Sequence, residues 1–181
     1  MKKLFFIVPL VLLFCFTIAC QDKAAMAELE KFKAQAALET QNIELIRKVL
    51  GEISNRNAAV FNKLYAPDYK YYFPSRAQTP FSREEEAAQV KVFFSAFPDL
   101  TNKVVDIFAV KDWVIARVIV SGTHQAELEG IPASGKKIEL SAIIIFRLKD
   151  GKVVEAFEEG DFLGLYQQLG MELKPIAAKK K

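Results

Sequence analysis

Four consecutive segments in the C-terminal half of the chain alternate apolar and polar residues, which is the pattern of half-buried β-strands. They are rich in Val, Ile and Phe and cover residues 102–110, 112–124, 136–151 and 152–161. Turn residues separate them: Lys111-Asp112, the Gly130–Gly135 loop, and Asp150-Gly151, a sequence typical of a tight hairpin. Short connections of this kind join neighbouring antiparallel strands, so the pattern predicts an antiparallel sheet.

The residues before these segments have a helical pattern. From Asp22 to about Ser54 the chain is rich in Ala, Glu, Lys, Leu and Gln, and it has no Pro or Gly before Gly51, so propensity predicts a helix. The first half has only a narrow apolar stripe, which indicates a stalk: Met26, Leu29 and Phe32. The second half has a wider apolar face and is expected to belong to the folded domain: Ile43, Ile46, Val49, Leu50 and Ile53.

Two shorter helices and one strand complete the predicted elements. One helix has Asn57 as a candidate N-cap and is stopped by Pro67, and another is capped by Ser82 and ends before Pro98. Between them, Tyr69–Phe73 predicts a short strand. Helices followed by an antiparallel meander predict one domain of the α+β class, in which a curved sheet buries one face against helices.

The first twenty residues, "MKKLFFIVPLVLLFCFTIAC", have the features of a secretory signal peptide: two lysines, an apolar run and small residues before Cys20. Their ending resembles the bacterial lipobox, although Thr17 replaces the usual Leu. This predicts cleavage after residue 19, lipidation of Cys20, and a domain anchored to a membrane of the cell envelope through its N-terminal lipid. The alternative is an ordinary signal peptide with a chance cysteine.

The predicted organisation has four parts: a signal peptide (1–19), a lipidated cysteine and helical stalk (20–38), a folded domain (39–174) and a basic tail (175–181). Cleavage removes Lys2 and Lys3 and lowers the formal net charge from +3 to +1, so no strong electrostatic case for nucleic-acid binding remains. Cleavage also removes Cys15, which leaves Cys20 as the only cysteine and allows no disulfide within the chain.

Three stretches near the C-terminus, in this order and at this spacing, resemble the SnoaL-like polyketide cyclases, or ester cyclases, of the nuclear transport factor 2-like superfamily. They are "FPDL", "VSGTHQAELEGIPASGKKIEL" and "FRLKDGKVVEAFEEGDFLGLYQQLG". The resemblance implies a conical α+β barrel, in which a strongly curved sheet wraps around a long helix and encloses a mostly apolar pocket. Members of this superfamily often pair through the exposed sheet face, so a homodimer is one assembly the resemblance suggests.

The resemblance also implies a catalytic residue. In characterised polyketide cyclases, an Asp near the end of the last strand is the general acid/base of an aldol closure that uses no metal or organic cofactor. That position falls on Asp161, and Phe157 occupies the position of the family's usual tryptophan. The lone histidine, His124, is the candidate to assist by donating a hydrogen bond or relaying a proton.

Each of these residues also has a purely structural interpretation. Asp161 stands where a helix begins, so it could be an N-cap, and His124 could simply hydrogen-bond a neighbouring strand. Arg147 could orient a ligand oxygen or form a surface ion pair with Glu155. The aromatic residues could fill the core or line the pocket, and the candidates for substrate binding are Tyr69, Tyr72, Phe94, Trp113, Arg147 and Phe157.

Motifs for other chemistry are missing. One histidine without a cysteine cluster gives no familiar zinc site, and the sequence has no phosphate-binding glycine loop, nucleophile elbow or dinucleotide fingerprint. The leading hypothesis is a domain that binds a small apolar molecule in its cone, with a cofactor-free acid/base step of the cyclase, isomerase or hydrolase type. The alternative is a non-catalytic module for ligand binding or dimeric assembly.

Overall fold

The computed structural model describes residues 7–73, 79–172 and 174, and their side chains from residue 23 on. By its contacts the chain divides into two compact units, Met1–Leu38 and Glu39–Lys181. The start of the predicted signal peptide, the side chain of Cys20 and the basic tail 175–181 all lie outside the described residues and side chains.

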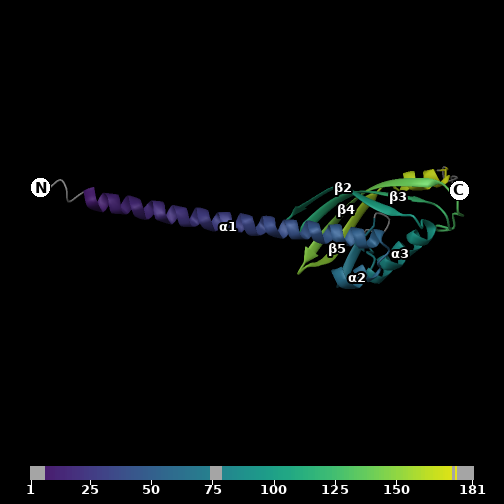
Figure 1. Cartoon of the computed structure of the whole chain (residues 1–181), viewed down its shortest axis with the longest axis horizontal. Helices are drawn as coiled ribbons and strands as arrows, with labels where there is room; N and C mark the ends of the chain where they lie inside the picture. Colours follow the sequence, from purple (N-terminus) through teal and green to yellow (C-terminus); the bar gives the residue numbers. More distant parts are fainter. Residues whose placement is uncertain (1–6, 74–78, 173, 175–181) are drawn as a thin grey trace, which may run out of the picture. The chain divides into compact units, whose positions relative to one another are not determined.

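Helix α1 (Ile7–Ser54) begins in the first unit and ends in the second (Figure 1). The sequence predicted its C-terminal end correctly. In the first unit the apolar stripe is exposed, with 57% of Met26, 45% of Leu29 and 61% of Phe32 accessible. Within the part of the chain that the structure describes, no helix combines the length and apolar character needed to cross a membrane.

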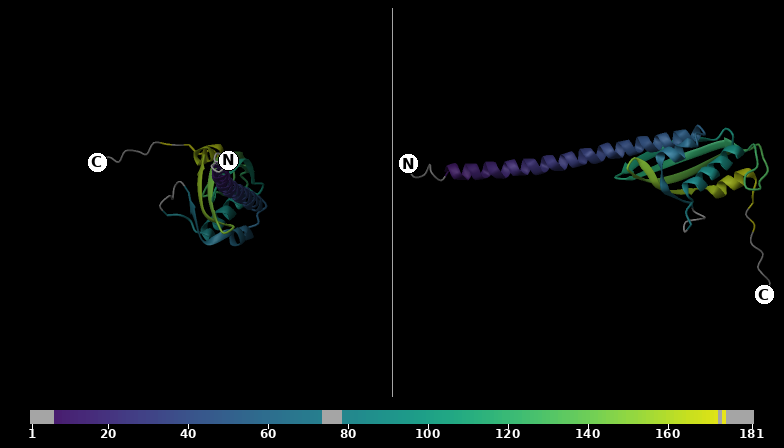
Figure 2. Two further views of the ribbon diagram at one scale, coloured as in Figure 1. Left: turned by 90° about the vertical axis from the view of Figure 1, so that its left-hand side faces the viewer. Right: turned by 90° about the horizontal axis from the view of Figure 1, so that it is seen from below.

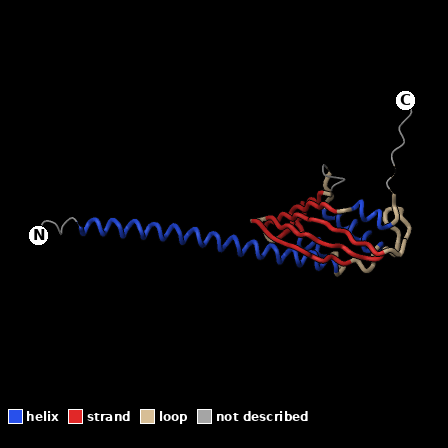
Figure 3. The backbone as a smooth tube through the Cα atoms, turned by 90° about the horizontal axis from the view of Figure 1, so that it is seen from above, coloured by secondary structure: helices blue, strands red, loops and turns tan. Residues whose placement is uncertain are grey.

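The second unit contains a five-stranded sheet with helices on one face (Figures 2 and 3). The strands are β1 (Tyr65–Tyr72), β2 (Thr101–Val110), β3 (Trp113–Thr123), β4 (Lys137–Lys149) and β5 (Lys152–Gly160), in the spatial order β1-β5-β4-β3-β2. Strands β2 to β5 form an antiparallel meander, as their alternation predicted. The predicted α+β class, with a curved sheet on N-terminal helices, is confirmed.

The prediction of a purely antiparallel sheet is wrong at one edge, because β1 pairs with β5 in parallel. The first strand is also longer than expected and begins at Tyr65, so Pro67 lies inside the strand rather than ending a helix. Strand β1 is an edge strand, and there a residue without an N–H group is tolerated on the unpaired side.

The hairpin between β4 and β5 has the expected geometry. Asp150 and Gly151 both have positive φ, 51° and 71°, and the flanking residues Lys149 and Lys152 are paired. Two consecutive residues with positive φ define the type I′ turn, whose twist matches that of the strands it joins.

Three further helices, α2 (Ala59–Leu64), α3 (Arg83–Ala96) and α4 (Phe162–Leu169), belong to this unit. Helix α3 begins at the predicted N-cap, Ser82, which forms a complete capping box with Glu85. The N-cap of α2 is Ala58 rather than the predicted Asn57, although Asn57 Oδ1 still accepts a hydrogen bond from Ala59 N (3.2 Å).

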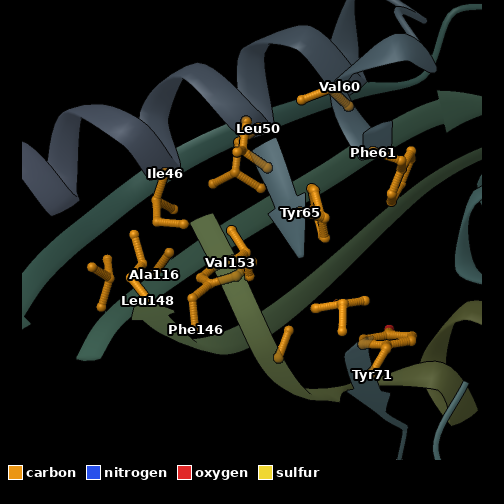
Figure 4. Close-up of a cluster of buried hydrophobic side chains, with 14 of the residues drawn as sticks. Ile46, Leu50, Val60, Phe61, Tyr65, Tyr71, Ala116, Phe146, Leu148 and Val153 are labelled. Atoms are coloured by element: carbon orange, nitrogen blue, oxygen red, sulfur yellow. The ribbon is translucent and has the colours of Figure 1, made fainter. Parts of the chain in front are cut away.

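The core lies between the inner face of the sheet and helices α1 and α2 (Figure 4). Ile46 and Val49 of α1 are fully buried, and Phe61 of α2 is nearly so. They face inward-pointing strand residues such as Ala116 and Phe146. These contacts explain the wide apolar face predicted for the second half of α1.

Candidate functional site: an acidic cavity

A cavity of about 270 Å³ lies within the second unit, between the inner face of the sheet and the helices. Most of its wall is apolar. Helix α3 contributes Val90, Phe93 and Phe94, and the sheet contributes residues from β3, β4 and β5. Further apolar wall residues are Leu50, Ile53, Phe73, Phe81, Leu100, Val118, Val120, Leu140, Ile144, Phe146, Ala156 and Phe162. A cavity of this size and character suits a small, mostly apolar ligand.

A carboxyl–phenol pair lies on one wall of the cavity. The Tyr71 hydroxyl donates a hydrogen bond of 2.6 Å to Glu158 Oε2. The strand register brings them together: Tyr71 pairs with Ala156, and the two-residue period of β5 puts Glu158 on the same face as Ala156. Burial raises the pKa of Glu158, the hydrogen bond from Tyr71 lowers it in part, and Glu159 raises it further. Burial and the nearby Glu158 likewise raise the pKa of Tyr71.

A second carboxyl group, Glu86 of α3, also lines the cavity. Burial raises its pKa to about 8, the nearby Tyr69 hydroxyl lowers it in part, and Glu158 adds a further rise. Tyr69 lies close enough to affect this pKa, but the two groups do not reach hydrogen-bond geometry. Glu86 Oε2 and Tyr69 Oη therefore have no hydrogen-bond partner among the described residues.

A second hydrogen-bonded pair joins the loop after β3 to helix α4. Tyr166 donates a hydrogen bond of 2.7 Å to Glu129 Oε2, and both residues line the cavity. This hydrogen bond raises the pKa of Tyr166 to about 12. Both side chains are at least partly exposed, so the pair lies where the cavity approaches solvent.

The charge of the cavity wall has one sign. Glu86, Glu129 and Glu158 contribute carboxyl groups, whereas none of the described lining residues is Lys, Arg or His. An anionic ligand would therefore meet no compensating charge from the described wall. No group of three or more His, Cys, Asp or Glu side chains that could hold a metal ion occurs in the described ranges 7–73, 79–172 and 174.

Comparison with known proteins shows which family this architecture represents. The sequence model of the SnoaL-like polyketide cyclases matches residues 44–169, which is more than half of the chain. The chain belongs to the SnoaL-like polyketide cyclase family. DnrD of Streptomyces peucetius, an aklanonic acid methyl ester cyclase, is 38% identical over 58 residues. That match covers 32% of this chain and 40% of DnrD, so this chain aligns with well under two thirds of the length of DnrD.

Solved structures of SnoaL-like proteins cover more of the chain. IdmH of Streptomyces antibioticus, a candidate polyketide cyclase, is 28% identical with a TM-score of 0.66, over 72% of this chain and 99% of its own. AclR of Streptomyces galilaeus, a candidate hydroxylase, is 26% identical with a TM-score of 0.67, over 73% and 97% of the two chains. These two proteins are named for different activities, so the shared fold does not by itself fix the reaction.

The SnoaL-like domain does not place Asp161 in the cavity. Asp161 is exposed and is the N-cap of α4, where its Oδ1 accepts a hydrogen bond from Gly164 N (2.8 Å). It is not a lining residue. The structure therefore shows the capping interaction, and the catalytic role of Asp161 remains a prediction from the family resemblance.

His124 is fully buried, but it does not line the cavity either. Its Nδ1 accepts a hydrogen bond from Ser134 N (3.2 Å) and lies 3.0 Å from Ser134 Oγ. Its ring packs against Phe97, with 5.3 Å between centroids. The structure thus does not bring His124 and Asp161 together at this site, and the assisting role of His124 also remains a prediction.

The six predicted substrate-binding residues divide between the two faces of the sheet. Phe94 lines the cavity, and Tyr69 lies behind the wall near Glu86. The other four residues lie on the outer face of the sheet: Tyr72, Trp113, Arg147 and Phe157. Side chains alternate between the two faces along a strand, and each of the four is next in sequence to a residue that points inward. These inward neighbours are Tyr71, Val114, Phe146 and Ala156.

The outer-face residues contact one another rather than the cavity. Tyr72 stacks on Phe157 (4.6 Å between centroids), and the Arg147 guanidinium lies 5.8 Å from the centroid of the Trp113 ring. Arg147 Nε also lies 3.3 Å from Glu155 Oε2, so these residues form the cross-strand ion pair that was one of the two interpretations of Arg147.

The sequence analysis missed the polar residues of the cavity, although two signals were present. Glu86 lies four residues before Val90, on the same helical face as the phenylalanines of α3. Glu158 lies two residues after the buried Ala156, at an inward position of β5. A charged residue at an inward position is unusual, and here it marks the site.

Proposed function

We propose that the domain binds a small, largely apolar, uncharged molecule in its cavity and catalyses a cofactor-free proton transfer on it, of the cyclase or isomerase type. The Tyr71–Glu158 pair inside an otherwise apolar cavity is the observation that carries this proposal. The methyl ester cyclase activity named for DnrD supports a reaction of this class.

In the proposed step, Glu158 is the base. Desolvation makes a carboxylate a stronger base, and the raised pKa of Glu158 has this cause. The carboxylate removes a proton from a carbon next to a ligand carbonyl, the C–H electron pair forms the enolate, and Glu158 holds the proton until it returns to the ligand. The Tyr71 hydroxyl fixes the orientation of the carboxylate through Oε2.

The test compares the full chain with Glu158→Gln, and uses Glu159→Gln as the matched control because Glu159 is the exposed neighbour on the same strand. Each protein is purified from the organism's own extract and analysed by native mass spectrometry and solvent extraction. A small molecule that accumulates only on Glu158→Gln is the expected result, since the variant binds substrate without converting it. The same molecule on all three proteins would show a binding module, and no bound molecule on any of them would contradict ligand binding.

A second function, assembly with another copy of the chain, is favoured by the outer face of the sheet. Four large apolar residues of this face are at least 36% exposed: Phe108, Val110, Ile143 and Ile145. Contiguous apolar surface of this kind commonly marks an interface. Light scattering should show a dimer that Ile143→Asp converts to monomer, and a monomeric wild-type chain would exclude this assembly.

Export and lipid anchoring form a separate proposal, supported by the "TIAC" sequence that ends at Cys20. We expect a lipid-modified N-terminus that holds the protein at a membrane of the cell envelope. In a bacterial host, Cys20→Ser should abolish processing to the lipidated form and release the protein from the membrane fraction. Unchanged processing and partitioning would contradict lipidation.

The family resemblance also supports Asp161 as base with His124 assisting. Asp161→Asn keeps the oxygen that caps α4, so it separates catalysis from stability. If Asp161 is the base, ligand accumulates on Asp161→Asn and not on Glu158→Gln.

A further inference from the structure

We infer that Glu86 is the proton donor of the cavity: it presents a neutral carboxyl group to an oxygen atom of an uncharged ligand, and the site rejects ligands that carry a carboxylate. This inference rests on the proposed binding function and adds the class of ligand and the role of a second acid. It concerns a residue on α3, which is remote in sequence from the strand-end Asp that the resemblance implies.

The position of Glu86 is the first support. It lies on the face of α3 that contributes Val90, Phe93 and Phe94 to the wall, and it lines the cavity with them. Its Oε2 atom has no contact with solvent and no hydrogen-bond partner among the described residues. A buried polar atom left without a partner costs about 1–3 kcal/mol. Oε2 itself offers no surface to a ligand, so a ligand oxygen would reach the Glu86 carboxyl group through the part of the side chain that lines the cavity.

The surroundings of Glu86 disfavour its ionised form. Four titratable groups interact electrostatically with Glu86: Tyr65, Tyr69 and Tyr71 of β1 and Glu158 of β5. None of these groups is a cation, in agreement with a pKa raised to about 8 by burial. At neutral pH the group is therefore an O–H donor.

The two acids of the cavity then have complementary roles. Glu158 already accepts the Tyr71 hydroxyl, which suits a carboxylate, whereas Glu86 has no donor in hydrogen-bond geometry at Oε2. In the proposed step, a proton passes from the ligand carbon to Glu158 while Glu86 donates its proton to the ligand carbonyl oxygen. The ligand becomes a neutral enol, and each acid exchanges one proton. A ligand carboxylate would instead add a negative charge beside Glu158, without a cation in the described wall.

The test measures the binding of three naphthalene probes to the full chain by titration calorimetry between pH 6.5 and 9.5. The probes are 2-acetonaphthone, an uncharged ketone; 2-naphthoate, a carboxylate of similar size; and naphthalene, which has no oxygen. Glu86→Gln keeps an N–H donor but cannot ionise. Glu84→Gln is the matched control, because Glu84 is exposed on the same helix. Thermal unfolding verifies that each variant is folded.

At pH 6.5 the ketone should bind at least about tenfold more tightly than naphthoate, which corresponds to about 1.4 kcal/mol. Its affinity should fall about tenfold by pH 9.5 in the wild type and in Glu84→Gln, but stay constant in Glu86→Gln. A constant ketone affinity in the wild type, or naphthoate binding as tight as the ketone, would overturn the role of Glu86. If naphthalene still binds in that case, the proposed binding function survives. Failure of both naphthalene and the ketone to bind would overturn the two proposals together.

Discussion

At the residue scale, the chain keeps two carboxyl groups in a mostly apolar cavity, where burial disfavours their charged forms. Hydrophobic residues at positions 86 and 158 would avoid this cost. Glu158 is held by Tyr71, whereas Oε2 of Glu86 has no partner among the described residues. Perturbed carboxyl groups gathered in one cavity are typical of functional sites.

The pH dependence of stability tests the state of Glu86. Its carboxyl has an ordinary pKa of 4.5 in the unfolded chain and about 8 in the folded one, so the folded state binds the proton more tightly. The resulting stabilisation is complete below pH 4.5 and is lost as the pH rises through 8. We expect the free energy of unfolding to fall by on the order of 4–5 kcal/mol over this window.

Urea unfolding of Glu86→Gln should show this decline largely removed, while Glu84→Gln should behave like the wild type. Glu158, whose pKa is also raised, contributes a decline of the same sign, so the slope of Glu86→Gln is expected to be smaller than that of the wild type rather than zero. Equal slopes in Glu86→Gln and the wild type would contradict a neutral Glu86 in the folded state.

At the element scale, strong local signals predicted the elements correctly. The capping box of α3, the type I′ turn after β4 and the alternation of β2 to β5 each depend on residues close in sequence. The parallel pairing of β1 with β5 joins residues 85 to 88 positions apart in the sequence, and local propensity carries no information on it. The inward positions of Tyr71 and Glu158 follow from that pairing, so the site could not be assembled from the sequence.

The hairpin after β4 gives a direct test of turn geometry. Gly151→Ala should lower the free energy of unfolding by about 1 kcal/mol, because φ at Gly151 is 71°. Gly51→Ala is the control: Gly51 lies within α1 and its added methyl group meets no atom within 4 Å. That change should stabilise the domain by about 0.5–1 kcal/mol. Equal effects from the two substitutions in denaturant titrations would contradict the assigned turn.

The N-cap of α4 gives a second test. Asp161→Ala removes the acceptor of the Gly164 N–H and should cost about 1 kcal/mol of unfolding free energy. Asp161→Asn keeps an oxygen at this position and should lower the free energy of unfolding by only about a few tenths of a kcal/mol. A loss in Asp161→Asn as large as that in Asp161→Ala would show that the negative charge, rather than the cap oxygen, stabilises the helix.

At the scale of the whole molecule, the SnoaL-like domain uses the two faces of its sheet differently. The inner face and the helices enclose the cavity, and the outer face exposes apolar side chains such as Phe108 and Val110. The fold and the family could be recognised from the sequence, since both depend on the order of elements and on short motifs. The sequence did not show which aromatic residues line the cavity. Phe157 and Trp113 lie on the outer face of the sheet, whereas Phe94 belongs to α3 and lines the cavity.

The most direct test of the central claim is the binding of naphthalene to the full chain and to Val120→Phe, measured by titration calorimetry. Val120 lines the cavity, so the larger side chain fills part of the space that a ligand would occupy. Val105→Phe is the control on an exposed position of β2. We predict one bound naphthalene per chain in the wild type and in Val105→Phe, and an affinity at least about tenfold weaker in a folded Val120→Phe. Binding that is absent in the wild type, or unchanged in Val120→Phe, would contradict a ligand-binding cavity.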